Sequence, residues 1–249
     1  MPQICFHLSI AREAAARLDH PVIEHNLGNF LLGSTLPDVH VMTRGPREET
    51  HFFNLEIEDN EKSVIVFLRS YPELANGPSL DGITSATVSG YLSHLITDEV
   101  WIIDIYRPFF GPSSPLATDP MANILDRVLQ YELGIRERLD KDNMNAIKSE
   151  LAYAKLGAGL GFIDEPTLRR WREVVIGFME RELDWSTFPL FARRYLPSQG
   201  MDQNEAERLV TSIPLMLERA MEQVTTGRIE DFKERSIAES VAAVGEYLS

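Results

Sequence analysis

The stretch GYLSHLITDEVW, residues 90–101, decides the fold class, because its apolar residues recur with the period of a helix. It lies in a helix predicted over residues 80–107, whose broad apolar face holds Val88, Tyr91, Leu92, Leu95, Ile96 and Val100. His94 and Asp98 stand four residues apart, so both side chains project from one face and can reach the same cation. An aspartate among such apolar neighbours is costly unless it is paired or binds metal. The alternative is a His–Asp pair on a solvated helix face.

Two segments upstream of this helix carry further ligand-type side chains. In LLGSTLPDVHVMTR (31–44), Pro37 restrains the backbone before it, so the turn presents Asp38 in a preorganised position. The alternative is that Asp38 caps a short helix. In RGPREETHFF (44–53), His51 precedes two phenylalanines that we expect to anchor its backbone in the core. Its alternative is a histidine with a satisfied hydrogen bond beside the core.

The histidines are segregated along the chain. All six lie within the first 94 residues, at positions 7, 20, 25, 40, 51 and 94, which indicates a single site. His25 and His40 are expected to be structural or surface residues, and the alternative is a hydrogen bond to a ligand or an extra ligand. Arg44 and Arg47 lie between two candidate ligand segments, where either can bind a substrate phosphate. The alternative for both is a solvated loop arginine.

The rest of the chain also favours helices. Proline and glycine punctuate residues 20–60 and predict loops there, with one short helix near 22–31. Residues 9–18 have helical spacing, with Ser9 as a candidate N-cap. The segment SVIVFL (63–68) is predicted to be helical, although its residues also suit a strand. Helical spacing recurs in 118–139, 142–156, 166–183, 203–224 and 228–248. The sequence therefore predicts an all-α protein of one domain, 1–249, in which residues 1–110 carry the metal site and residues 118–249 add further helices.

Composition limits the partners. The 249 residues carry a formal net charge of −14, which disfavours nucleic acid or an anionic lipid surface as a standing partner. Cys5 is the single cysteine, so no intramolecular disulfide can form. The N-terminal residues lack the pattern of a signal peptide, and no apolar run reaches the roughly 20 residues of a membrane helix. We expect a cytoplasmic protein without a transmembrane segment.

The ligand-type residues occur in a recognisable order. An early His7 is followed by G-S-x-x-P-D (33–38), by R-x-x-x-H (47–51) and by G-Y-x-x-H-x-x-x-D (90–98). This order resembles the zinc-dependent phospholipase C-like family, which is similar in fold to bacterial secreted phospholipase C and the S1/P1-type nucleases. The resemblance covers roughly residues 1–110. It implies an all-α fold that binds divalent metal and cleaves phosphodiesters or phospholipid head groups.

The resemblance also implies a ligand set. His51, His94, Asp98 and Asp38 match the principal metal site, and His7 matches the histidine that holds a neighbouring ion with a shared carboxylate. Nitrogen and oxygen donors in this mixture suit zinc, with iron or manganese as alternatives. The histidines that form a further site in the secreted enzymes have no counterpart after residue 94, so a three-metal centre is not expected.

The sequence leaves more than one function open. The first is a metal-dependent hydrolase in which a metal-activated water attacks a phosphoester of a small molecule or phospholipid, with Asp38 or Asp98 as the base that orients this water. The second is a helical metal-binding protein without phospholipase activity, acting as a binding or structural module. The third is a metalloenzyme that acts on a different small metabolite. Glu99 and Asp104 are further candidates for oxygen ligands, although Glu99 points away from Asp98 on the helix and a solvated position is its alternative.

Overall fold

Every regular element among the described residues is helical, as the sequence predicts. The structure is a computed structural model that describes residues 3–53, 61–181, 184–185, 188 and 203–249, with the backbone alone for 203–211. The longer helices are α1 (Ile4–Leu18), α3 (Leu27–Gly33), α6 (Ser63–Ser70), α7 (Gly82–Trp101), α9 (Ala122–Glu137), α10 (Lys141–Tyr153), α11 (Glu165–Glu180), α13 (Gln203–Gln223) and α14 (Thr226–Tyr247). Short helical pieces connect them: α2 (Pro21–His25), η1 (Leu36–Val39), α4 (His40–Thr43), α5 (Glu48–His51), η2 (Pro72–Leu74), η3 (Gly77–Ser79), η4 (Ile102–Tyr106) and α8 (Arg107–Phe109).

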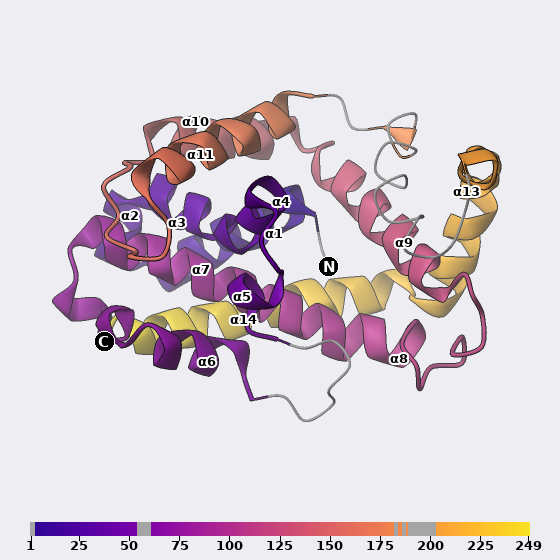
Figure 1. The fold of residues 1–249 in the computed structure, drawn as a ribbon, viewed down its shortest axis with the longest axis horizontal. Coiled ribbons are helices and arrows are strands. Elements are labelled where there is room, and N and C mark those ends of the chain that lie inside the picture. Colours follow the sequence, from indigo (N-terminus) through magenta and orange to yellow (C-terminus); the bar gives the residue numbers. More distant parts are fainter. Residues whose placement is uncertain (1–2, 54–60, 182–183, 186–187, 189–202) are drawn as a thin grey trace.

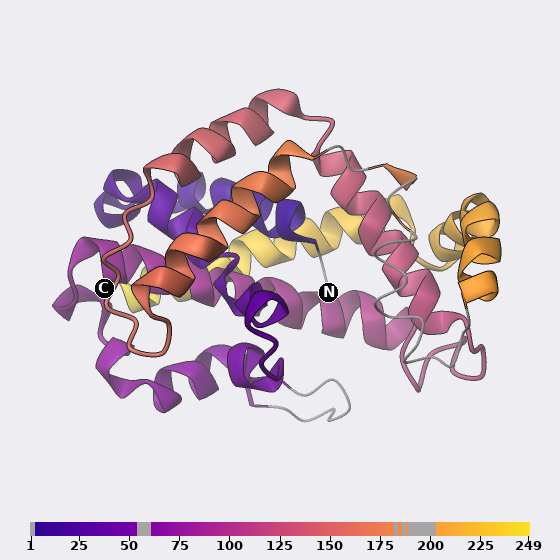
Figure 2. The same cartoon turned by 45° about the horizontal axis from the view of Figure 1, so that its top comes forward.

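Helix α7 forms the centre of the molecule. Every residue from Thr84 to Trp101 except Glu99 is buried. Helix α14 runs alongside α7, helix α3 crosses it, and α1 lies against α14 (Figure 1). Helices α10 and α11 cover α3 and α1 on one side, while α9 and α13 pack together at one end of the molecule (Figure 2). A helix buried on nearly all sides places its polar residues inside the protein.

The predicted helix over residues 80–107 is confirmed in extent, and its far end has a distinct geometry. The Asp81 carboxylate caps the start of α7 by accepting from the amides of Ile83 and Thr84. After Trp101 the helix widens into the π-helical segment η4 before α8. Pro108 has no amide hydrogen for the usual bond to the carbonyl four residues earlier, and this loss accounts for the irregular turn.

The structure corrects two boundaries near the N-terminus. Helix α1 begins at Ile4, so Ser9 is a buried residue inside the helix and not its N-cap, and His7 is helical. The short helix predicted near 22–31 is two helices, α2 and α3, separated at Asn26. The segment SVIVFL is helical in α6. The later helices lie within a few residues of their predicted limits, and residues 182–183 of the predicted 166–183 lie outside the described residues.

Two glycines let α3 and α7 approach unusually closely. A Cβ added to Gly90 would lie 1.9 Å from the Phe30 carbonyl oxygen, and one added to Gly33 would lie 2.1 Å from the Thr87 carbonyl oxygen. Both distances are far below any tolerated contact, so only glycine fits at either position. This crossing brings the loop after α3, which carries Asp38, beside the polar face of α7.

The buried apolar residues form two clusters that meet along α7. Tyr91, Leu92 and Leu95 belong to the first cluster, which extends to α3, α10 and α11. Ile96 and Trp101 belong to the second cluster, which extends to α9, α13 and α14. His94 and Asp98 therefore lie at the junction of the two clusters.

Among the described residues, no helix combines the length and apolar character that crossing a membrane requires.

Candidate metal centre

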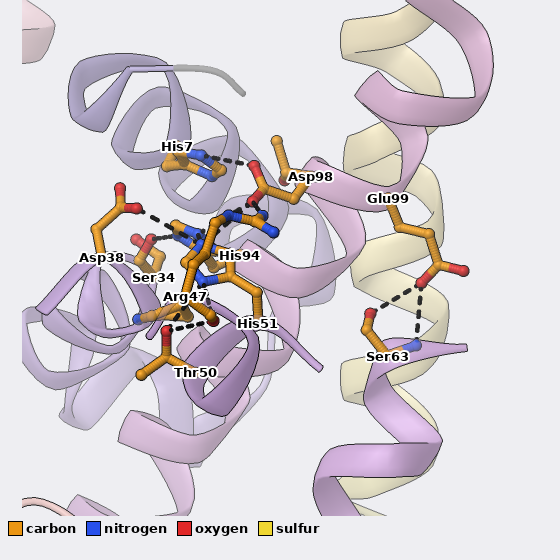
Figure 3. A network of polar contacts seen from close by, with 12 residues as sticks. His7, Ser34, Asp38, Arg47, Thr50, His51, Ser63, His94, Asp98 and Glu99 are labelled. Atoms are coloured by element: carbon orange, nitrogen blue, oxygen red, sulfur yellow. Dashed lines mark hydrogen bonds and ion pairs between the residues drawn. The ribbon is translucent and has the colours of Figure 1, made fainter. Parts of the chain in front are cut away.

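The structure brings all five predicted ligands together. His7 comes from α1, Asp38 from η1, His51 from α5, and His94 and Asp98 from α7 (Figure 3). Within the described residues, two groups of donor atoms are close enough to hold an ion: His7 with His94 and Asp98, and Asp38 with His51 and His94. Three of the four elements converge on the polar face of α7, so its position determines the geometry of the cluster.

Three donor atoms form a compact triangle at the centre of this cluster. The Nε2 atoms of His51 and His94 are 3.3 Å apart, and Asp98 Oδ2 is 3.4 Å from the first and 3.6 Å from the second. A point equidistant from three atoms so spaced lies about 2.0 Å from each, which is the usual zinc-to-nitrogen distance. Asp38 Oδ1, 3.5 Å from His51 Nε2, offers a fourth donor. The triangle fits a divalent transition metal as it stands, whereas Asp38 would have to move closer to complete a fourth position.

Backbone carbonyl groups orient both histidines of the triangle. His94 Nδ1 lies 2.8 Å from the Ser34 carbonyl oxygen, so this nitrogen carries the proton and donates it. His51 Nδ1 lies 3.3 Å from the Arg47 carbonyl oxygen and 3.0 Å from the Thr50 hydroxyl, which itself donates to that carbonyl. With Nδ1 protonated in both rings, the two Nε2 lone pairs point at one another. A metal ion between the two rings would resolve this conflict, and carbonyl-oriented imidazoles are usual around bound metals.

His7 approaches the other oxygen of the same carboxylate. Its Nε2 atom is 3.3 Å from Asp98 Oδ1, and its ring stacks on His94 with centroids 3.9 Å apart. Among the described residues, neither ring nitrogen of His7 nor Asp98 Oδ1 makes a hydrogen bond, although all three atoms are buried. Buried polar atoms without partners are rare in native proteins and mark a place for a ligand. Each oxygen of Asp98 therefore faces a different set of histidines, and each could contribute to holding a cation.

Burial and charge shift the pKa values of the cluster in opposite directions. Burial lowers the pKa of His51 to about 4 and also lowers the pKa of His7. For His94 burial acts in the same direction, but the charge of Asp98 outweighs it and raises the pKa. Burial opposes ionisation of Asp38 and Asp98, yet the neighbouring histidines hold both carboxyl pKa values low. The cluster thus holds two ionised carboxylates and favours neutral imidazoles at His7 and His51, whereas the raised pKa of His94 favours its protonated form, which must lose a proton before it can bind a metal.

The two candidate phosphate-binding arginines lie in different surroundings. Arg47 Nη2 donates to Asp98 Oδ2 at 3.0 Å, so this guanidinium is in direct contact with the ligand set. Arg44 is exposed, in the left-handed backbone conformation that follows α4. The side chains of Asp38 and Arg47 are 21% and 19% exposed, whereas His51 is 1% exposed. Asp38 and Arg47 are therefore the members of this group that solvent contacts.

Other side chains that the sequence left open lie elsewhere. Glu99 does not face the cluster but accepts hydrogen bonds from the amide and hydroxyl of Ser63 (Figure 3), and Asp104 pairs with Arg235. His25 is exposed, with its ring nitrogen bonded to the Pro21 carbonyl. His20 caps α2. His40 packs edge-on against His51, with Nδ1 bonded to the Pro37 carbonyl, and lies outside both donor groups.

Sequence reasoning missed the groups that hold the ligands. The Ser34 carbonyl is a backbone atom, so no residue type announces it. The Tyr91 hydroxyl donates a hydrogen bond of 2.5 Å to the Thr50 carbonyl oxygen. This bond connects α5 to α7, because Tyr91 lies on α7 about one turn before His94. The sequence indicated Arg47 only as a phosphate-binding residue.

Comparison with protein-family models, characterised proteins and solved structures finds no match to this chain.

Proposed function

We propose that the protein is a metal-dependent hydrolase that cleaves phosphoesters at this cluster. The observation that carries the proposal is the position of Asp98, whose Oδ2 faces His51 and His94 while its Oδ1 faces His7. A carboxylate shared in this way is how two-ion sites for phosphoryl transfer hold their ions a few ångströms apart. The resemblance of the ordered motifs to the zinc-dependent phospholipase C-like family supports the same chemistry, and we extend it to the fold type of that family.

The two ion positions are unequal. His94 Nδ1 is committed to Ser34, so His94 has only Nε2 to give and can complete one of the two donor groups. We assign it to the position shared with His51, Asp38 and Asp98 Oδ2, which then has four protein donors. The second position keeps His7 and Asp98 Oδ1 and binds its ion more weakly. Zinc fits the donors best, with manganese or iron as alternatives.

The charges of the site favour an anionic substrate. The two carboxylates and the Arg47 guanidinium leave one net negative charge, so a single divalent ion makes the buried site positive. An isolated charge in such surroundings is costly, and a phosphoryl group compensates it. The substrate enters between Asp38 and Arg47, where the side chains are partly exposed. Arg47 binds the phosphoryl oxygens there, and Arg44 assists from the rim.

The two aspartates have separate roles. A divalent ion held by these residues would supply polarisation of the phosphoryl oxygen and a water of lowered pKa. Asp38, which is partly exposed at the mouth, orients the attacking water and accepts its proton. Asp98 is buried and its two oxygens face different histidines, so we assign it a positioning role and keep it as the alternative base.

A second function is favoured by the closure of the first ion position. Four protein donors, three of them from almost wholly buried side chains, are typical of structural metal sites, whereas catalytic sites keep an open position. In that case the protein is a metal-binding helical module without hydrolase activity. Action on a different small metabolite fits the same donors.

One experiment tests the metal and the chemistry in sequence. Elemental analysis of the purified protein should find between one and two equivalents of transition metal. The chelated protein is then supplied with zinc, manganese or iron and assayed on bis-p-nitrophenyl phosphate and phosphatidylcholine. Metal-restored turnover supports the hydrolase, and a raised melting temperature without turnover supports the structural alternative. Failure to take up any of the three metals refutes both.

A further inference from the structure

The Arg47 side chain and the proposed metal position meet at a single oxygen atom. Asp98 Oδ2 accepts from Arg47 Nη2 at 3.0 Å and is also the corner of the triangle formed with His51 and His94. A carboxylate oxygen can accept a hydrogen bond and bind a cation at once. Each positive partner, however, withdraws charge from it, so the two contributions are less than additive.

The main chain of Arg47 is tied to the segment that carries His51. Its carbonyl oxygen accepts from Thr50, and His51 Nδ1 is directed toward it. The Tyr91 hydroxyl then holds Thr50 against α7. Arg47 is thus connected to one ligand through its main chain and to another, Asp98, through its side chain. Its side chain is only 19% exposed, so its interaction with Asp98 is poorly screened by solvent.

We propose that Arg47 is an internal cation that shares Asp98 with the bound metal, weakens metal binding and becomes available to the substrate phosphate as the metal binds. The inference rests on the proposed metal site and deepens it. It makes Arg47 a positioning and specificity-determining residue whose partner changes from a carboxylate to an anion.

The sign of the effect follows from comparing the two states of the protein. Without metal, removal of the guanidinium leaves Asp98 buried and short of positive charge, which is strongly destabilising. With metal, the ion supplies that charge, and the repulsion between ion and guanidinium also disappears. The loss therefore falls mainly on the metal-free state, so removing the charge of Arg47 should strengthen metal binding. A residue that only orients Asp98 would have the opposite effect.

Three variants separate charge from geometry. Arg47→Gln keeps an amide donor for Asp98 but removes the charge, Arg47→Lys keeps the charge, and Arg44→Gln removes an equal charge from an exposed arginine in the same segment. Zinc affinity is measured by competition with a chromogenic chelator, and melting temperatures are recorded for the chelated and zinc-loaded forms.

We expect Arg47→Gln to bind zinc about tenfold more tightly than the unsubstituted protein, as loss of one charged hydrogen bond from the metal-free state predicts. Its melting temperature should fall more in the chelated than in the zinc-loaded form. Arg47→Lys and Arg44→Gln should keep the original zinc affinity. In the zinc-loaded protein, inorganic phosphate should bind Arg47→Gln more weakly than the unsubstituted protein, measured by calorimetry.

Several outcomes would overturn the inference. Weaker zinc binding by Arg47→Gln would make Arg47 an orienting residue, and equal affinities in all three variants would mean that it is not coupled to the metal. If chelated Arg47→Gln is unfolded, zinc-induced refolding followed by circular dichroism gives the affinity instead, and failure to fold even with zinc contradicts a defect confined to the metal-free state. Absence of zinc binding in the unsubstituted protein is a different result, because it removes the proposed function itself.

Discussion

The close crossing of α3 and α7 can be tested with a single methyl group. Gly90→Ala would place a Cβ 1.9 Å from the Phe30 carbonyl oxygen and 2.8 Å from the Ser34 amide nitrogen. Both atoms belong to the backbone and cannot rotate away, so the helices must separate by about 1 Å to reach a tolerated contact. Gly177 in α11 provides a matched control, because an added Cβ there meets nothing within 4 Å.

The expected magnitude combines two opposing terms. Overpacking against the backbone lowers the free energy of unfolding by about 3 kcal/mol, and the higher helix propensity of alanine raises it by about 1 kcal/mol. The net loss of stability expected for Gly90→Ala is therefore about 2 kcal/mol. The same separation lengthens the 2.8 Å contact between His94 Nδ1 and the Ser34 carbonyl beyond hydrogen-bond range. Without that partner the orientation of His94 is lost, so metal affinity should fall by about tenfold or more.

Urea unfolding and a chelator competition measure the two effects separately. The chelated Gly177→Ala protein should be slightly more stable than the unsubstituted one, with unchanged metal affinity. Gly90→Ala should lose both stability and affinity. If Gly90→Ala behaves like Gly177→Ala in both assays, the crossing is not a tight constraint and the position of the Ser34 carbonyl does not depend on it.

Three further predictions concern the donor residues themselves. His94→Ala and Asp98→Ala should each lose bound metal and melt at a lower temperature, because a ligand bound only by the native state stabilises that state. His25→Ala should keep both its metal and its melting temperature. Equal metal content in the three variants, measured by elemental analysis, would place the ion elsewhere. Asp38→Asn retains an oxygen donor but loses the charge and the proton acceptor, so turnover of an identified substrate should fall far more than metal content. Full retention of turnover and metal would leave Asp38 as a loop residue only. The pKa of His51 is about 4 in the folded protein and about 6.5 in the unfolded chain. Between these two pH values the unfolded chain binds a proton that the folded protein does not bind. The free energy of unfolding therefore falls as the pH drops from the higher value to the lower one. Urea titrations of the chelated protein should show a loss on the order of 3 kcal/mol that His51→Gln removes, and parallel pH profiles for the two proteins would contradict this assignment.

The helices were predictable where burial imposes a period. The apolar spacing of residues 88–100 identified α7, and the four-residue spacing of His94 and Asp98 placed both on one face, with Nε2 and Oδ2 now 3.6 Å apart. Glycine in residues 20–60 was interpreted only as a signal for loops, and this interpretation was wrong for α3. Gly28 and Gly33 lie inside α3, where an added Cβ would meet the backbone of α10 or α7 at about 2 Å. Their small size serves helix packing, which one-dimensional patterns do not show.

The candidate ligands were predictable from residue type and order, but the contacts that hold them were not. Arg47 contacts Asp98 because α5 folds back on α7, an approach fixed by Tyr91 and Thr50 and not by any local propensity. Glu99 is adjacent to Asp98 in sequence, yet its position on the helix turns it toward Ser63. The start of α1 was missed because Gln3 makes no side-chain cap, and packing of the first turn replaces that signal.

The location of the cluster links the fold to its chemistry. His7, His51, His94 and Asp98 are buried where the two apolar clusters meet, a position in which unpaired polar atoms reduce stability. The donors come from α1, from the segment 38–51 and from α7, so they converge only when these elements have packed. A metal that needs all of them binds the folded chain and not the unfolded one, and its binding free energy becomes folding free energy. The same burial that makes the metal-free site costly also reduces solvent screening around Arg47 and Asp98, so we expect one guanidinium to alter both metal affinity and the binding of an anion.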